Sequence, residues 1–285
     1  MMVPKLFRPW VWMLGWSLII ATMSVVVLND AQIDWRKKLL EEYWKKTYLA
    51  DPKTRPNIVV LGNSLVGRSF PLSSEVSHFF GEKYSWANVW IGGASYKDFS
   101  GFFLESTQHY DLIIINLDTL AHGPSRRGRR TLKNYPNMVK RRLLFDPIQN
   151  IFEEFYLASQ GWCKSRDKES IEKIVDNINK RYNFNKNTFN ERAQFLQSLK
   201  AVSKKIVVVE LPRAGSLTEK VGASLISYRD HFSTFLQEQG VEFVSLGESM
   251  PEDHYCDGSH PNDRGRKVRR AQLLNLVEDR LSSRQ

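Results

Sequence analysis

The chain has 285 residues, of which 42% are hydrophobic, so it can bury a substantial core in one large domain or two small ones. Its charged fraction of 25%, with no low-complexity tract and no internal repeat, argues against a disordered chain and against a repeat protein. The formal net charge of +10 favours an anionic neighbour, and nucleic acid, acidic lipid and acidic polysaccharide all fit the charge alone.

The N-terminal region contains one long apolar segment. Residues 10–28 read WVWMLGWSLIIATMSVVVL without a charged residue, and as a helix they are roughly 28 Å long, enough to cross the hydrocarbon core of a bilayer. The alternative is a cleaved signal peptide, but the run exceeds a usual apolar h-region and no A-x-A-like cleavage site follows it. We therefore predict a transmembrane helix. Basic residues lie on both sides of it, so charge does not fix its orientation.

The segment after the span also has helical periodicity. Residues 34–49 place apolar side chains at helical spacing between lysines, which predicts an amphipathic helix that either lies on the lipid surface or packs against the folded domain. Residues 51–56 contain two prolines and are expected to form a hinge. The predicted domains are thus residues 1–50, a membrane anchor with its juxtamembrane helix, and residues 51–285, a globular domain.

Short apolar runs in the globular part are typical of buried strands, and most stretches between them can hold a helix. The runs are residues 57–61, 88–91, 112–117, 206–211 and 241–246. Amphipathic helices are predicted at residues 190–202, 224–239 and 262–281, with Gly240 as a helix stop. The alternation predicts a three-layer α/β/α sandwich around a mostly parallel sheet. Residues 119–188 break it and are expected to form an insertion.

The basic residues and the cysteines limit which partners and cofactors are expected. Residues 126–142 and 264–270 are basic clusters, which fit either an anionic partner or a solvated face. No nucleic-acid-binding motif is present, so a nucleic-acid partner is not expected. The two cysteines, Cys163 and Cys256, match no zinc site or CxxC redox pair, and they could form one disulfide or stay as two buried thiols. No metal and no cofactor is predicted.

Functional residues of open parallel sheets collect where the strands end. The first predicted strand runs directly into Gly62, Asn63 and Ser64, and Ser64 is expected to begin a helix at this edge of the sheet. A serine at this place exposes its hydroxyl, and its own N–H can face developing negative charge, which suits acyl chemistry. The alternative is a serine that only caps the helix.

A second candidate segment lies near the C-terminus, where DGSHPN, residues 257–262, precedes the last predicted helix. A carboxylate three residues before a histidine can accept from one ring nitrogen and leave the other free to act as a base. The alternative is that Asp257 only stabilises a turn and His260 is an ordinary surface residue. The chain order Ser64, Asp257, His260, with the last two close together near the C-terminus, predicts a catalytic triad.

This pattern resembles the SGNH (GDSL-like) hydrolase superfamily from about residue 57 to the last helix, the insertion excepted. The resemblance implies a flavodoxin-like α/β/α fold in which Ser64 is the nucleophile and His260 is the general base, held by Asp257. The first family block is commonly G-D-S, whereas this chain has Asn63 at the middle position. The last block matches without change.

The resemblance also implies an oxyanion hole. The second family block, N-x-G-x-x-G, corresponds to NVWIGG at residues 88–93, where Gly93 would donate its N–H. The third block, G-x-N-D, has no asparagine at its usual place in this chain, because Asn116 falls two residues early and Asp118 takes the position of the donor. Asn116 is kept as a candidate donor that needs a rearranged loop.

A single span followed by an SGNH-like domain is similar to exported proteins that acetylate alginate-like polysaccharides and to the anchored protein that assists D-alanylation of teichoic acids. The resemblance implies a serine hydrolase or acyltransferase that modifies a cell-envelope or exported polysaccharide. It also implies a domain outside the cytoplasm, in the periplasm or at the cell surface, and a polytopic membrane acyltransferase as a candidate partner. Two alternatives stay open: a plain lipid or carbohydrate esterase, and a catalytically silent assembly protein that retains the fold.

Overall fold

The computed structural model describes most of the globular part of the chain. The described residues are 12–13, 15–17, 56–71, 73–90, 95–99, 109–121, 168–181 and 189–282. The chain divides into two units, Met1–Ala50 and Asp51–Gln285, and each is described by itself.

In the first unit the described residues are helical, and Trp12, Met13 and Trp16 are exposed. None of the helices within the described stretches has the length and hydropathy needed to span a membrane. Most of the predicted span at residues 10–28, and all of the predicted amphipathic helix at residues 34–49, lie outside the described residues.

The second unit is built on a five-stranded parallel sheet, which confirms the predicted α/β class. In chain order its strands are β1 (Ile58–Gly62), β2 (Trp86–Trp90), β3 (Leu112–Asn116), β4 (Ile206–Glu210) and β6 (Glu242–Ser245). Their order across the sheet is β2-β1-β3-β4-β6, a doubly wound arrangement in which β1 and β3 flank the point where the strand order reverses. Ligands of such sheets bind beyond the carboxyl ends of the strands at this switch point.

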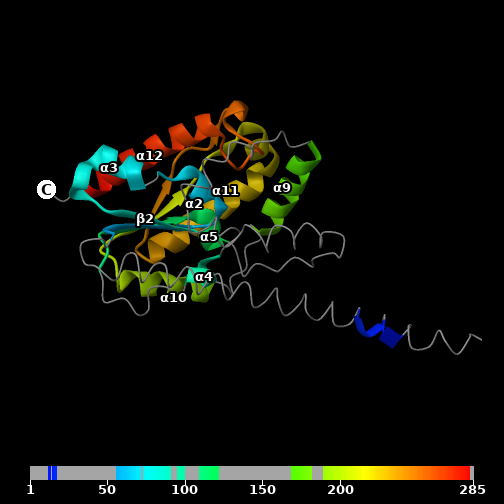
Figure 1. Cartoon of the computed structure of the whole chain (residues 1–285), viewed down its shortest axis with the longest axis horizontal. Helices are drawn as coiled ribbons and strands as arrows, with labels where there is room; N and C mark the ends of the chain where they lie inside the picture. The colour runs from blue at the N-terminus through cyan, green and yellow to red at the C-terminus, as the bar shows by residue number, and fades with distance from the viewer. Residues whose placement is uncertain are drawn as a thin grey trace, which may run out of the picture. The chain divides into compact units, whose positions relative to one another are not determined.

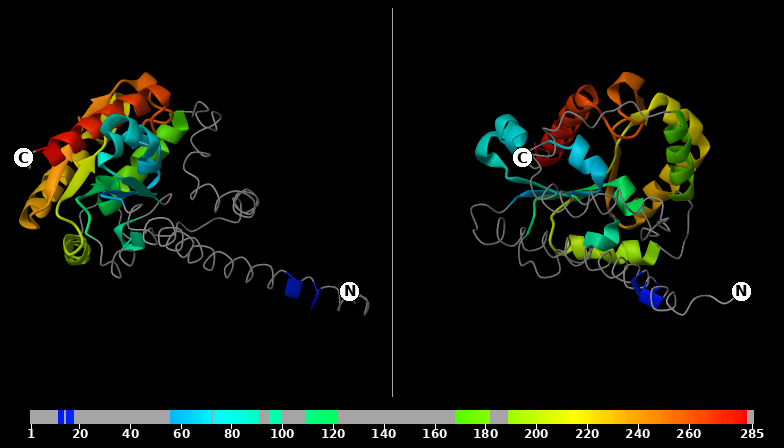
Figure 2. Two further views of the ribbon diagram at one scale, coloured as in Figure 1. Left: turned by 60° about the vertical axis from the view of Figure 1, so that its left-hand side comes forward. Right: turned by 45° about the vertical axis from the view of Figure 1, so that its right-hand side comes forward.

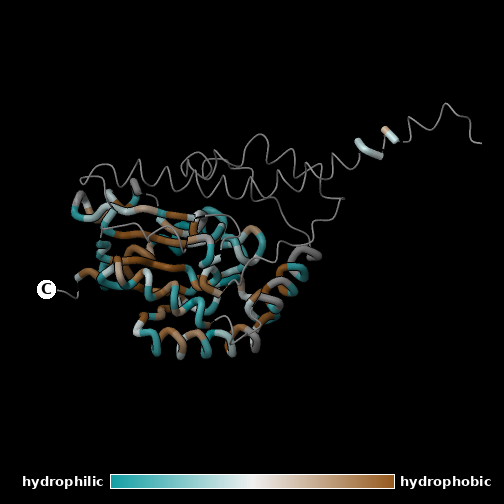
Figure 3. Tube along the Cα trace, turned by 90° about the horizontal axis from the view of Figure 1, so that it is seen from below, coloured by the Kyte–Doolittle hydropathy of each residue, from teal (hydrophilic) through white to brown (hydrophobic). Residues whose placement is uncertain are grey.

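Burial explains why these segments are strands. Every residue of β1, β3 and β4 is buried, so both faces of these strands need apolar, mostly β-branched side chains. Figure 3 shows this hydrophobic stretch along the strands, with hydrophilic residues concentrated on the outer helices. A further two-stranded parallel pair, β5 (Arg213–Ala214) with β7 (Ser249–Met250), was not predicted, because two-residue strands carry no periodicity.

Helices cover both faces of the sheet (Figures 1 and 2). On one face are α2 (Ser64–Ser69), α3 (Ser73–Phe80) and α12 (Asp263–Ser282), whose apolar residues share one core with alternate residues of the strands. On the other face are α4 (Tyr96–Phe99), α10 (Phe189–Lys200) and α11 (Gly215–Glu238), the last two joined by the Phe189 ring against Phe232 and Phe235. Two more helices are α5 (Leu117–Ala121), directly after β3, and α9 (Lys168–Arg181), which contacts α11.

One predicted helix begins more than two residues away from its observed start. Helix α11 begins at Gly215 rather than at residue 224. Leu217, Val221 and Leu225 recur at helical spacing and are all buried, and this burial outweighs the low helix propensity of Gly222. The insertion predicted at residues 119–188 stays a prediction, and its first residues, 119–121, are the buried end of α5. Apart from α9, the rest of that range lies outside the described residues.

The C-terminal basic cluster is not a free cationic face. Three of its arginines form ion pairs and a fourth, Arg269, is fully buried. The pairs are Arg264 with Asp253, Arg266 with Asp263, and Arg270 with Glu75. The basic cluster at residues 126–142 lies outside the described residues.

The turn from β1 into α2 requires glycine at residue 62, since a Cβ atom there would lie 1.9 Å from Val66 Cγ2. We predict that Gly62→Ala lowers the free energy of unfolding by about 1–3 kcal/mol, because Val66 cannot move within the core. The control is Gly222→Ala in α11, where the added Cβ meets no described atom within 4 Å outside the adjacent helix backbone and the helix gains roughly 0.5–1 kcal/mol. Urea unfolding followed by circular dichroism measures both, and equal effects of the two substitutions would contradict the close approach at residue 62.

Candidate functional site

Ser64 is the first residue of α2, directly after the buried strand β1. The residue that caps this helix is Asn63, whose side-chain Oδ1 accepts the Leu65 N–H at 2.9 Å. The capping role that a serine could have taken is therefore filled by its neighbour, and the Ser64 hydroxyl is available for another partner. As a residue of the first turn, Ser64 also has a backbone N–H with no acceptor inside the helix.

The segment that carries His260 is a tight loop at the same edge of the sheet. It is closed by a bridge between Tyr255 and Pro261 and by a hydrogen bond of 2.9 Å from Cys256 N–H to His260 O. Gly258 has a φ of 77°, a left-handed conformation that costs energy for residues with a side chain. The Asp257 carboxylate accepts the backbone N–H groups of Ser259 and His260, so the same side chain that binds the imidazole also shapes the loop.

The structure brings the side chains of Ser64, His260 and Asp257 together. The Ser64 Oγ lies 3.2 Å from His260 Nε2, and His260 Nδ1 lies 3.0 Å from each carboxylate oxygen of Asp257. The Asp257 side chain is 2% exposed and that of His260 is 20% exposed, so the carboxylate is sealed while the ring reaches solvent. When Nδ1 carries the proton shared with Asp257, Nε2 is free to accept the proton of the Ser64 hydroxyl.

The environment of Asp257 favours its ionised form. Burial by itself raises the pKa of the carboxyl group, but the hydrogen bond and positive charge of His260, together with the two backbone donors, outweigh burial and lower the pKa of Asp257 to about 2. The carboxylate is therefore ionised at neutral pH, where it orients the imidazole and stabilises its protonated form.

The residues around the third family block are placed as follows. Asn116 ends β3 and is fully buried, and its side-chain N and O have no hydrogen-bond partner among the described residues. Asp118, at the position of the family's donor, is buried and accepts from Arg213 Nη2 at 2.6 Å, and Arg213 Nη1 lies 3.4 Å from Ser259 Oγ. An ionised carboxylate accepts hydrogen bonds and cannot donate one to an oxyanion. The role of Asn116 stays a prediction, and Gly93 lies outside the described residues.

Asn88, at the start of the second block, stabilises the fold in this structure. Its amide Nδ2 donates to the Pro71 carbonyl at 2.7 Å and its Oδ1 accepts the Trp86 indole N–H at 2.9 Å. These bonds tie edge strand β2 to the chain after α2.

Two buried arginines beside the His260 loop, Arg213 and Arg269, were missed as site residues in the sequence. For Arg269 a signal existed, because it falls on the apolar face of its helix, four residues before the buried Leu273 and eight before the buried Val277. An arginine at such a place in a helix indicates a buried cation with a particular partner. Arg213 lies in an irregular stretch where no such pattern exists.

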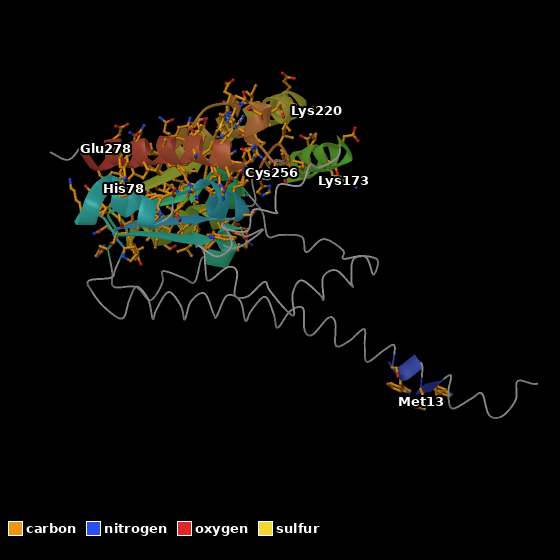
Figure 4. All side chains as sticks on the ribbon, turned by 45° about the horizontal axis from the view of Figure 1, so that its top comes forward. Met13, His78, Lys173, Lys220, Cys256 and Glu278 are labelled. Carbon is orange, nitrogen blue, oxygen red and sulfur yellow. The ribbon has the colours of Figure 1, made fainter. Side chains whose placement is uncertain are left out.

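Cys256, directly before Asp257, is disulfide-bonded. The sequence offers one other cysteine, Cys163, which lies outside the described residues. Figure 4 places Cys256 in the loop at the start of the red helix α12. The residue next to the candidate carboxylate is therefore covalently fixed. Among the described residues there is no group of three or more side chains that could hold a metal ion.

Comparison with solved structures finds several that are similar to this chain at low sequence identity. The chain is similar to an acetylxylan esterase from Geobacillus stearothermophilus, with 12% identity over 76% of this chain and 92% of that one, at a TM-score of 0.44. It is similar to an extracellular lipase from Streptomyces rimosus, with 11% identity over 77% and 98% and a TM-score of 0.42. It is also similar to a carbohydrate acetylesterase from Sinorhizobium meliloti, with 12% identity over 79% and 98% and a TM-score of 0.39. No protein-family model and no curated protein matches the chain.

The low pKa of Asp257 makes its contribution to stability depend on pH. The contribution is complete above the ordinary pKa of 3.8 and is lost as the pH falls towards the folded-state pKa of about 2. We predict that wild type exceeds Asp257→Asn in unfolding free energy above about pH 4 and that this difference shrinks by about 2 kcal/mol as the pH approaches 2. Denaturant unfolding of both proteins across this range measures the difference. A difference that stays constant would show that the carboxylate is not held in its ionised form.

Proposed function

We propose that this chain is a serine acyl-ester hydrolase or acyltransferase of the SGNH type. The observation that carries the proposal is the single line of contacts from the Ser64 hydroxyl through the His260 ring to the Asp257 carboxylate. The line lies beyond the carboxyl end of β1, at the switch point of the sheet, where substrates of this architecture bind. The Ser64 hydroxyl contacts one nitrogen of the ring and the buried Asp257 carboxylate contacts the other. Acyl transfer needs this arrangement of nucleophile, base and carboxylate.

In the first half-reaction His260 Nε2 takes the proton of the Ser64 hydroxyl as Oγ attacks the carbonyl carbon of the ester. The resulting tetrahedral intermediate collapses when the bond to the leaving alkoxide breaks, and the alkoxide takes the same proton from Nε2. The products are an alcohol and an acyl group esterified to Ser64. Asp257 keeps its negative charge throughout and stabilises the imidazolium that exists between the two proton transfers.

The negative charge on the carbonyl oxygen needs preorganised donors. The backbone N–H of Ser64 is one, because it lies in the first turn of α2 and beside the attacking oxygen. Gly93 is proposed as the second donor on the strength of its place in the second family block. Asp118 cannot supply a third, and the loss of one such donor costs on the order of a hundredfold in rate. We therefore expect a slower enzyme than one that retains all three.

In the second half-reaction an acceptor hydroxyl gives its proton to His260 Nε2 and attacks the acyl carbon on Ser64. The bond from that carbon to Ser64 Oγ then breaks, and Oγ takes the proton back from Nε2, which frees the enzyme. Water as acceptor makes the protein an esterase, and a sugar hydroxyl makes it an O-acyltransferase. We favour the modification of a cell-envelope or exported polysaccharide, because an apolar N-terminal segment followed by an SGNH-like domain is the organisation of anchored proteins with that task. A polytopic acyltransferase would then supply the acyl group.

We propose that residues 10–28 anchor the protein in a membrane and that the globular domain lies outside the cytoplasm. The disulfide bond of Cys256 supports this location, since disulfides persist in oxidising compartments and are rare in the cytosol. A membrane-impermeant fluorophosphonate applied to intact cells, after permeabilisation of any outer membrane, is expected to label the protein. Labelling only after the inner membrane is opened would place the domain in the cytoplasm.

The serine-reactive fluorophosphonate group tests the triad directly. We predict stoichiometric labelling of Ser64 in the full-length protein, located by mass spectrometry of the labelled peptide. His260→Ala is expected to slow labelling by about a thousandfold or more, because the hydroxyl then has no base. Ser198→Ala is the matched control, since this serine bonds within α10 to the Phe195 carbonyl and is expected to leave labelling unchanged.

Absence of an adduct at Ser64, under conditions that label a known serine esterase, would remove the enzymatic proposal. An adduct at a different serine would do the same. Hydrolysis of a small soluble acetyl ester by the isolated protein would favour the plain esterase over the polysaccharide acyltransferase.

A second candidate function is a catalytically silent assembly protein, and the Asp118–Arg213 ion pair favours it. This pair replaces an oxyanion donor by an acceptor that is already bound to a cation. If the protein is catalytically silent, the Ser64→Ala variant expressed from the chromosome of a deletion strain restores the lost function as fully as wild type does. In an enzyme, it fails to do so although the variant is present at wild-type levels.

A further inference from the structure

Arg269 is among the largest fully buried side chains of the protein, with 1% of its surface exposed. It lies on α12, the helix that follows the His260 loop. Arginine is almost never fully buried unless its charge is paired. In the described part of the chain, however, Arg269 forms no ion pair with a carboxylate, and burial lowers the pKa of its guanidinium. The nearby Asp118 carboxylate favours the charge and the Arg213 guanidinium opposes it, and neither forms a direct pair with Arg269.

The guanidinium donates to uncharged oxygens that come from three separate segments. Its Nη1 donates to Ser69 Oγ at 2.6 Å, in the last residue of α2. Its Nη2 donates to the Ser259 carbonyl at 3.3 Å, to the Tyr255 hydroxyl at 3.1 Å and to the Pro212 carbonyl. The Tyr255 hydroxyl in turn donates to the Pro212 carbonyl at 2.7 Å, and the Arg269 guanidinium lies 5.1 Å from the centre of the Tyr255 ring.

These segments are the two halves of the proposed site and the chain behind them. Helix α2 begins with Ser64 and ends with Ser69, so the arginine holds the far end of the helix that carries the nucleophile. Tyr255 and Ser259 bracket Asp257, and Ser259 is the residue before His260. One planar group therefore joins the nucleophile helix to the base loop, although they are about 200 residues apart in the sequence.

Stability alone does not account for this arrangement. Apolar residues of similar volume often replace buried charged groups at no cost or with a gain in stability. Lysine would keep the charge, but its single ammonium cannot reproduce the planar fork that reaches both segments. The guanidinium contacts both α2 and the loop that precedes His260, and these two segments carry the side chains that meet at 3.2 Å.

We propose that Arg269 is a positioning residue, which holds the Ser64 helix and the His260 loop in the relative position that proton transfer needs. The inference rests on the proposed acyl-transfer function and names the buried group on which that site depends. Arg269 does not touch the reacting atoms. It acts through Ser69 on one side and through Tyr255 and Ser259 on the other.

Turnover of p-nitrophenyl acetate by the full-length protein tests the inference. Arg269→Met and Arg269→Lys are both expected to lower kcat by about a hundredfold with KM within roughly threefold of wild type, because a misplacement on the order of 1 Å impairs proton transfer more than substrate binding. The rate of fluorophosphonate labelling is expected to fall in parallel. The control is Arg270→Met, the next residue of α12, which pairs with Glu75 and is expected to retain wild-type kcat. Wild-type kcat in Arg269→Lys would overturn the inference, because the fork would then be unnecessary.

If the Arg269 variants fail to fold, Ser69→Ala still tests the inference. It removes the hydrogen bond between Arg269 and Ser69 and leaves the buried cation in place. A roughly tenfold loss of kcat at unchanged KM is expected, the effect of one hydrogen bond to a charged group. Wild-type kcat in Ser69→Ala would count against the inference.

A readout without turnover separates this inference from the proposed function. The NMR shift of the His260 ring C–H reports the position of the ring whether or not the protein is an enzyme. It is expected to move in Ser69→Ala and to stay unchanged in Arg270→Met. If wild type neither turns over ester nor binds the probe, the proposed function fails, while a moved His260 signal still supports the positioning role. An unmoved signal overturns it.

Discussion

The imidazole of His260 contacts two side chains at once, and these lie far apart in the sequence of the globular domain. Asp257 is three residues away and reaches Nδ1 within its own loop, whereas Ser64 is 196 residues away and reaches Nε2 only because the sheet brings the ends of its strands together. Parallel strands with right-handed crossovers place all their carboxyl ends on one edge. The parallel pairing of β1 with β3 and of β3 with β4 is therefore the constraint on which the site depends.

The edge of the sheet brings Ser64 and the His260 loop near each other, and buried polar groups then fix the positions of their side chains. Asn63 caps α2 and leaves the Ser64 hydroxyl free, while Asp257 accepts two backbone N–H groups of its own loop. The Asp118–Arg213 pair and Arg269 add buried charge next to the loop, which is costly to desolvate. A site whose supporting groups cost stability is typical of regions that are shaped for function.

Much of the architecture could be predicted from the sequence, because β1, β3 and β4 are buried on both faces and read as short, uninterrupted apolar runs. Gly240 ends α11 as expected, with a φ of 59°. The start of α11 was predicted too late, since tertiary packing of its first turns outweighs their low propensity. The pair β5–β7 is too short to leave a pattern.

The candidate site also contains residues that the sequence predicts and residues that it does not. Ser64, Asp257 and His260 could be singled out because their residue types suit acyl transfer and because their order and spacing resemble a known family pattern. Arg213 and Arg269 could not be assigned a role, since no sequence pattern marks their partners. Those of Arg269 are backbone carbonyls and hydroxyls, and that of Arg213 is a carboxylate 95 residues away. The third family block illustrates the limit: the sequence shows that Asp118 replaces a donor, but only the structure shows that Arg213 binds it.

The central claim is that Ser64 and His260 work as one unit, and a double-mutant cycle on ester turnover measures this most directly. In a unit, Ser64→Ala, His260→Ala and the double variant all lose about the same factor in kcat/KM, because either substitution alone abolishes the transfer of the proton. Losses that multiply in the double variant, or a His260→Ala protein as active as wild type, would contradict the account.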